Sequence, residues 1–197
     1  VRQALRQRVL NGRRPGRHGR ALVRHHQRVT AVLAYHERHR MALVERQIGN
    51  AVHAAIQYEL DGDLDESSVS TVIMGYVKAW RKFRADMGLT DADFGDAEKP
   101  LYSTFGFAGT PDIPLCLDGD WGILDLKTAD ALHPAWALQT AAYMALVNEN
   151  TPAGQHRLKR RFALRLRDDG QFRLDEFKDK SDWPTFQACL IVAKWQR

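Results

Sequence analysis

An aspartate–glycine pair, Asp118-Gly119, constrains the fold of this chain more than any other feature of its sequence. The pair lies between two short apolar runs that favour β-structure, and Asp-Gly in that position predicts a hairpin closed by a two-residue turn. Leu117 then lies opposite Asp120, and counting outward along both strands places Asp112 opposite Asp125. Residues that face each other in this way have β-carbons about 5 Å apart on one side of the sheet.

The two faces of this hairpin are predicted to differ in polarity. Side chains alternate between the faces of a strand, so Lys127 shares a side with Asp125 and Asp112. The aliphatic residues fall on the other side, which suits a core: Ile113, Leu115, Leu124 and Leu126. Two facing carboxylates repel each other unless a cation lies between them. The pattern therefore predicts a site for a hard divalent ion, with a lysine that can activate a water or stabilise developing charge, as metal-assisted phosphodiester hydrolysis requires.

Two helices are predicted to flank the hairpin in sequence. Apolar residues recur at helical spacing from Met41 to about Leu60, which places His53 one turn after Gly49, where a small residue leaves room for a neighbouring segment. A second helix is expected over Trp136–Val147, with Gln139 and Tyr143 one turn apart. Taken alone, a histidine or tyrosine in such a position is more often structural than functional.

The remaining elements complete an α/β pattern. An amphipathic helix is expected over Val69–Met87, a strand around Glu98–Phe107, a hairpin over Phe162–Leu174 and a closing amphipathic helix over Trp183–Trp195. This order predicts one α/β domain with a small mixed sheet flanked by helices. The segment Arg157–Arg167 has a basic face that suits phosphate contacts, although most charge runs are only solvated surface.

Charge divides the chain into an Arg-rich extension, residues 1–40, and a domain over residues 41–197. The extension holds eleven arginines and one acidic residue, a net charge of +10, whereas the remainder holds 18 basic and 23 acidic residues, a net charge of −5. A basic arm on an acidic body is typical of a tail that contacts nucleic acid or another anion. An inert extension, or a region translated ahead of a natural start near Met41, remains equally open.

Composition narrows the class of protein and its compartment. Two cysteines, Cys116 and Cys189, are too few for a disulfide framework and indicate a reducing compartment. They also cannot supply the four thiolates of an iron–sulfur cluster. No run approaches the roughly 18 apolar residues of a membrane span, and the N-terminus has no apolar signal-peptide segment. We therefore expect a cytoplasmic protein without a membrane partner.

Four short motifs resemble, in residues and order, those of one nuclease superfamily. Pro111-Asp112 followed by Asp125-Leu126-Lys127 resembles the PD-(D/E)xK signature, and Gly109 to Asp112 resembles the GxxD form of its first half. Gln139 to Tyr143 matches the QxxxY motif of the RecB-like and phage-exonuclease branch, and Gly49 to His53 matches its GxxxH motif. Together the motifs span about half of the chain.

The resemblance implies a restriction-endonuclease-like fold and a Mg²⁺- or Mn²⁺-dependent DNA nuclease, most similar to exonucleases of recombination, repair or phage DNA processing. It implies metal ligands at His53, Asp112, Asp125 and the Leu126 carbonyl. It also implies that Lys127 positions or activates the attacking water, and that Gln139 and Tyr143 orient the site. Some RecB-like nucleases carry an iron–sulfur cluster, which is not expected here. The implied partners are DNA and a single-strand annealing protein or recombinase, in a bacterial or phage-infected cell.

Several alternatives remain open from the sequence. Glu98 resembles the acidic residue that often precedes the GxxD element, and it either supports the metal or faces solvent. The chain can also be an endonuclease of the same superfamily, of the resolvase or restriction type, or a non-catalytic nucleic-acid-binding module. The intact set of Asp112, Asp125 and Lys127 argues against a relic. A purely structural protein gives no reason for polar residues on an otherwise apolar hairpin.

Overall fold

The computed structural model describes residues 42–196. The predicted extension, residues 1–40, lies outside the described residues. Contacts divide the chain after Arg46, and the sheet, the core and the site below all belong to the unit that begins at Gln47. In the part that the structure describes, no helix is both long and apolar enough to cross a membrane.

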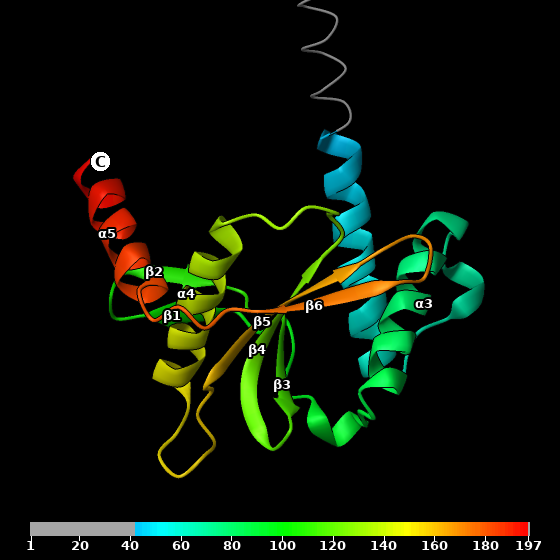
Figure 1. The fold of residues 1–197 in the computed structure, drawn as a ribbon, viewed down its shortest axis with the longest axis horizontal. Helices are drawn as coiled ribbons and strands as arrows, with labels where there is room; N and C mark the ends of the chain where they lie inside the picture. Colours follow the sequence, from blue (N-terminus) through cyan, green and yellow to red (C-terminus); the bar gives the residue numbers. More distant parts are fainter. Residues whose placement is uncertain (1–41, 197) are drawn as a thin grey trace, which may run out of the picture. The chain divides into compact units, whose positions relative to one another are not determined.

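A mixed four-stranded sheet forms the centre of the described domain (Figure 1). Its strands lie in the order β3 (Ile113–Leu117), β4 (Asp120–Lys127), β5 (Arg160–Leu166) and β6 (Phe172–Glu176). The β4–β5 pair is parallel and the two outer pairs are antiparallel. A parallel pair needs a crossover connection, which helix α4 (Ala135–Asn150) supplies. The predicted α/β class with a small mixed sheet is thus confirmed.

The predicted helices are also present, within a few residues of their expected ends. The first covers residues 42–60. It is followed by α3 (Thr71–Asp86), between the short 3₁₀ turns η1 (Glu66–Ser68) and η2 (Asp91–Asp93). The last is α5 (Asp182–Trp195), which packs against α4.

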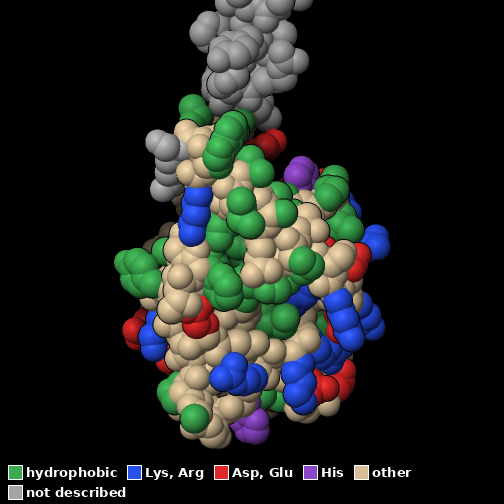
Figure 2. All heavy atoms as spheres, turned by 90° about the vertical axis from the view of Figure 1, so that its left-hand side faces the viewer, with side chains coloured by type: hydrophobic (Ala, Val, Ile, Leu, Met, Phe, Trp, Pro, Cys, Tyr) green, Lys and Arg blue, Asp and Glu red, His purple; other side chains and the backbone are tan. Residues whose placement is uncertain are grey.

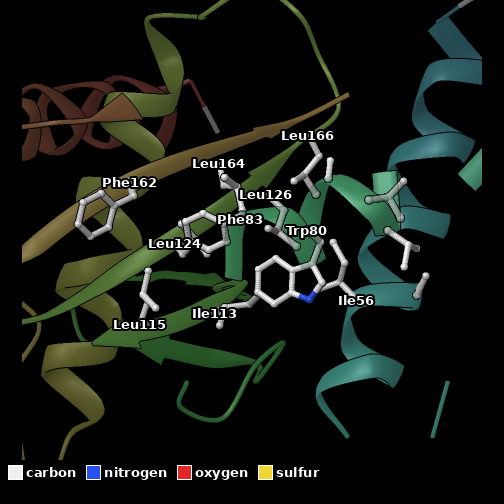
Figure 3. Close-up of a cluster of buried hydrophobic side chains, with 14 of the residues drawn as sticks. Ile56, Trp80, Phe83, Ile113, Leu115, Leu124, Leu126, Phe162, Leu164 and Leu166 are labelled. Carbon is white, nitrogen blue, oxygen red and sulfur yellow. The ribbon is translucent and has the colours of Figure 1, made fainter. Parts of the chain in front are cut away.

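The hydrophobic core lies on one face of the sheet, under the helix over residues 42–60 and α3 (Figure 3). Ile56, Trp80 and Phe83 come from these helices and are almost fully buried. They meet the aliphatic and aromatic residues of three strands: Ile113, Leu115, Leu124, Leu126, Phe162, Leu164 and Leu166. Burying each such side chain stabilises the fold by about 1.5–3 kcal/mol. The apolar face predicted for the first hairpin is therefore confirmed as a core face.

The hairpin has the predicted register. Leu117 pairs with Asp120 and Ile113 pairs with Leu124. Asp118 and Gly119 have φ angles of 55° and 83°. Both lie in the left-handed region that a type I′ turn requires, and this turn matches the twist of the two strands. The turn therefore sets which residues of β3 and β4 share a face.

The single strand predicted around Glu98–Phe107 is present only in part, because a turn interrupts it. Two short strands, β1 (Leu101–Ser103) and β2 (Phe107–Gly109), pair with each other outside the main sheet and pack on α4. Gly106, with a φ angle of 76°, closes the turn between them. Three aromatic residues, Tyr102, Phe105 and Phe107, spread across both strands and the turn, so the sequence pattern did not mark the break.

Most of the basic side chains predicted to form a face over Arg157–Arg167 are paired with acidic residues of the same protein. Arg161 is buried and its guanidinium lies 2.8 Å from the Asp182 carboxylate. Arg165 is also buried, 2.8 Å from the Asp175 carboxylate. These two side chains join β5 to α5 and to β6, so they are not free to contact phosphates. A charge pattern in sequence does not reveal which charges have internal partners.

Helix α5 is confirmed, but it is not amphipathic as predicted. None of its residues is buried. Figure 2 shows hydrophobic side chains gathered on the face where α5 and the β1–β2 hairpin lie. Phe107 of the hairpin packs against Phe186 of α5, whereas Ile191 and Trp195 are exposed to solvent.

Candidate metal centre

The residues predicted for the site come together at the end of the β3–β4 hairpin. His53 comes from the helix over residues 42–60, Asp112 directly precedes β3, and Asp125 and Lys127 lie on β4. Helix α4 contributes the two residues of the QxxxY motif from the other side. The first hairpin and the crossover helix therefore build most of this centre.

Two buried carboxylates form its middle. Asp112 is 5% exposed and Asp125 is 1% exposed. Oδ2 of Asp112 accepts a hydrogen bond of 2.6 Å from the backbone N–H of Leu126. Burial, reinforced by the negative charge of Asp125, raises the pKa of Asp112 to about 7. Burial also raises the pKa of Asp125, although the charge of Lys127 opposes this. The two groups therefore resist ionising together.

Asp125 has fewer hydrogen-bond partners than Asp112. The ammonium of Lys127 lies 2.6 Å from Oδ2 of Asp125. This contact is an ion pair, and within residues 42–196 no further group makes a well-aligned hydrogen bond to either oxygen of Asp125. A buried carboxylate in that condition is costly. A cation bound by Asp125 would relieve the cost, although among the described residues the ligand atoms within 4.8 Å of one another belong to His53, Glu98 and Asp112 and not to Asp125.

His53 contacts acceptors with both ring nitrogens. Nδ1 lies 3.1 Å from a carboxylate oxygen of Glu98, and Nε2 lies 3.2 Å from the carbonyl oxygen of Leu126. Only the doubly protonated ring donates from both nitrogens. Burial by itself lowers the pKa of His53, but the hydrogen bond to Glu98 and the charges of Asp112 and Glu98 outweigh it and raise the pKa. The surrounding carboxylates thus favour the positively charged form of His53.

The spacing of these groups fits a small divalent ion. His53, Glu98 and Asp112 each offer one ligand atom, and these atoms lie within 4.8 Å of one another. Neighbouring ligands of an octahedral Mg²⁺ at about 2.1 Å are about 3.0 Å apart, close to the 3.2 Å between Nε2 of His53 and the Leu126 carbonyl oxygen. Carboxylates and a carbonyl are the donors that Mg²⁺ and Mn²⁺ prefer.

Glu98, whose role the sequence left open, belongs to this cluster. Besides its contact with His53, its backbone N–H donates to the carbonyl oxygen of Asp112 at 2.8 Å. Its φ angle of 51° is uncommon for a residue other than glycine. Strained backbone of this kind persists where the surroundings hold it, and it often marks functional sites.

Lys127 is held from several sides. Its ammonium lies 3.2 Å from Oε1 of Gln139, and Nε2 of Gln139 donates to the hydroxyl of Tyr143 at 3.1 Å. The ammonium also lies 5.6 Å from the centre of the Trp136 ring, a separation typical of a cation–π contact. The structure thus joins the QxxxY residues to the lysine. Trp136 was not identified from the sequence, although it lies one helical turn before Gln139.

The glycines of two motifs have different structural roles. A Cβ added to Gly109 would lie 3.0 Å from Cε1 of Tyr143, so glycine leaves room for the tyrosine ring. A Cβ added to Gly49 would lie 3.5 Å from Oγ1 of Thr128, an ordinary contact. The close approach expected at Gly49 is therefore not a steric requirement.

No model of a known protein family matches this chain, and no curated protein matches it either. The likeness to the nuclease superfamily therefore rests on the four motifs alone.

Proposed function

We propose that this protein is a divalent-metal-dependent nuclease that hydrolyses phosphodiester bonds of DNA, most similar to the RecB-like and phage-type exonucleases. The observation that carries the proposal is the Asp125 carboxylate, which is buried beside Asp112 and lies 2.6 Å from the ammonium of Lys127. An arrangement that costs stability and joins two carboxylates to a lysine is expected where those groups do chemistry.

The ligand roles follow from the positions of the donors. Asp112, Asp125 and the Leu126 carbonyl would hold Mg²⁺ or Mn²⁺, together with His53 after loss of its proton. Glu98 lies beside His53 and can either ligate the ion or accept a hydrogen bond from the ring. When bound, the ion supplies a Lewis acid for the phosphate and lowers the pKa of a bound water.

Lys127 supplies the second chemical function. Its ammonium can hold the attacking water in position and stabilise the charge that develops on the phosphate oxygens. Gln139 accepts from this ammonium and is itself tied to Tyr143, so the lysine has a defined orientation. Such preorganised charge is worth more in a buried site than in water.

Cleavage of linear and circular DNA tests the proposal. Purified protein is incubated with end-labelled linear DNA and with covalently closed circles, in Mg²⁺, in Mn²⁺ and in EDTA. We expect degradation of linear DNA only with metal, and intact circles. Nicking of the circles would instead assign an endonuclease of the same superfamily. The double variant Asp112→Asn/Asp125→Asn, purified in parallel, controls for contaminating nucleases. A wild-type preparation that cleaves no DNA in either metal would contradict the proposal.

A further inference from the structure

A polar cavity of about 370 Å³ adjoins the candidate metal centre. Its lining consists of Asn50, His53, Ala54, Gln57 and Glu98. Two of these residues belong to the centre, whereas Asn50, Ala54 and Gln57 take no part in the proposed reaction. All the lining residues except Ala54 carry polar groups, which can orient a ligand by hydrogen bonds.

The lining follows one face of the helix over residues 42–60. Residues three or four positions apart in a helix lie one above the other. Asn50 therefore lies one turn before His53, and Gln57 lies one turn after it. Ala54 lies between them and leaves space because its side chain is a single methyl group. If a DNA phosphate binds at His53, the adjoining nucleotide would thus lie next to the amide side chains of Asn50 and Gln57.

The two amides have unused hydrogen-bonding capacity. Nε2 of Gln57 donates to both carboxylate oxygens of Asp61, at 3.2 and 3.0 Å, which leaves Oε1 of Gln57 as an acceptor. That oxygen is buried without a partner in the described part of the chain. Asn50 is exposed, and between residues 42 and 196 no hydrogen bond uses its side chain. Asn50 can therefore donate to a ligand, and Gln57 can accept from one.

We propose that this cavity holds the nucleotide adjoining the scissile phosphate, with Asn50 and Gln57 as positioning residues. This inference rests on the proposed nuclease function. The amide of Asn50 donates to an oxygen of the neighbouring phosphate. Oε1 of Gln57 accepts from a base N–H or from a hydroxyl at the end of the strand. Both groups are uncharged, so neither competes with the carboxylates for the metal.

The steady-state kinetics of substituted proteins test this assignment. Cleavage of end-labelled DNA in Mn²⁺ is measured for Asn50→Ala, Asn50→Asp and Gln57→Leu. Losing one hydrogen bond should raise KM about three- to tenfold in Asn50→Ala and Gln57→Leu, with kcat nearly unchanged. Asn50→Asp keeps the shape of the side chain but adds a negative charge facing a phosphate, so its KM should rise further. Tyr58→Ala is the control, because Tyr58 lies on the same helix, is 56% exposed and does not line the cavity.

Melting temperatures in Mn²⁺ separate positioning from a structural role. Gln57→Leu removes a buried acceptor that has no partner, but also two exposed hydrogen bonds to Asp61, so its Tm should stay close to that of the wild type. Wild-type KM in all three variants, or a fall in kcat that follows a loss of Tm, would overturn the inference while leaving the nuclease proposal intact. If the wild-type protein cleaves no nucleic acid, both the nuclease proposal and this inference fail.

Discussion

At the scale of single residues, Asp112 and His53 bind protons that a metal ion would displace. Asp112 has a pKa of about 7 instead of its ordinary 3.8, and the pKa of His53 is also raised. Between about pH 4 and pH 7 the folded metal-free protein therefore binds more protons than the unfolded chain. Stability from both groups is present at low pH and is lost as the pH rises through their folded pKa values. Metal binding should release these protons.

This proton balance predicts that Asp112→Asn stabilises the metal-free protein at pH 8. The amide oxygen can still accept from the Leu126 N–H, but the repulsion from Asp125 is gone. We expect Tm in EDTA to rise by several degrees at pH 8 and to change little at pH 5.5, since about 1 kcal/mol shifts Tm by roughly 2–4 °C in a domain of this size. Mn²⁺ should raise the Tm of the wild type but not that of the variant. Thermal unfolding at both pH values checks this, and a lower Tm for Asp112→Asn at pH 8 in EDTA would contradict it.

Some residues of the centre could not be assigned from the sequence. His53 and Glu98 are 45 positions apart, and their contact depends on a left-handed backbone at Glu98 that no local pattern predicts. Trp136 looks like an ordinary first-turn residue until the position of Lys127 is known. By contrast, Asp112 and Asp125 could be paired in advance, because one local turn sets their register.

At the scale of elements, α4 and the end of β2 depend on each other. Gly109 ends β2 and faces the ring of Tyr143. The hairpin of β3 and β4 was predictable because its turn residues and its alternation agree. The hairpin of β1 and β2 was not predictable, because strands of three residues are too short to show a clear alternation of apolar and polar side chains.

Gly109→Ala should therefore lower both the cleavage rate and the stability of the fold. The added methyl group would displace Tyr143 and weaken its hydrogen bond with Gln139, which in turn holds Lys127. We expect a several-fold slower single-turnover rate and a loss of about 1–3 kcal/mol in unfolding free energy. Gly49→Ala is the matched control, since its methyl group makes only an ordinary contact and alanine is the better helix former by about 1 kcal/mol. Equal rates in both variants would show that the Gly109–Tyr143 contact does not matter for catalysis.

At the scale of the whole molecule, the positive charge that suits DNA binding and the candidate metal centre belong to different parts of the sequence. Residues 41–197 carry a net charge of −5, and the most buried arginines of β5 are paired internally. A polyanion is therefore not attracted by the net charge of this domain. The eleven arginines of residues 1–40 form the largest concentration of positive charge in the sequence.

Deleting residues 1–40 should weaken DNA binding and flatten its salt dependence. For duplex DNA, the slope of log K against log salt becomes shallower by about 0.9 for every phosphate that the protein no longer neutralises. Cleavage at saturating DNA should be largely kept, because the centre lies elsewhere in the sequence. Binding measured at a series of salt concentrations checks this, with the full chain as reference. An unchanged slope would show that the extension does not bind DNA.

The most direct measurement of the central claim is single-turnover cleavage by Lys127→Ala, with its Tm in Mn²⁺ measured alongside. If Lys127 serves the reaction, the variant keeps its metal ligands, so it should still be stabilised by Mn²⁺ and should still bind DNA. Its cleavage rate should fall by about 10²-fold or more. A Lys127→Ala protein that is folded, stabilised by Mn²⁺ and cleaves DNA at the wild-type rate would contradict the proposed mechanism.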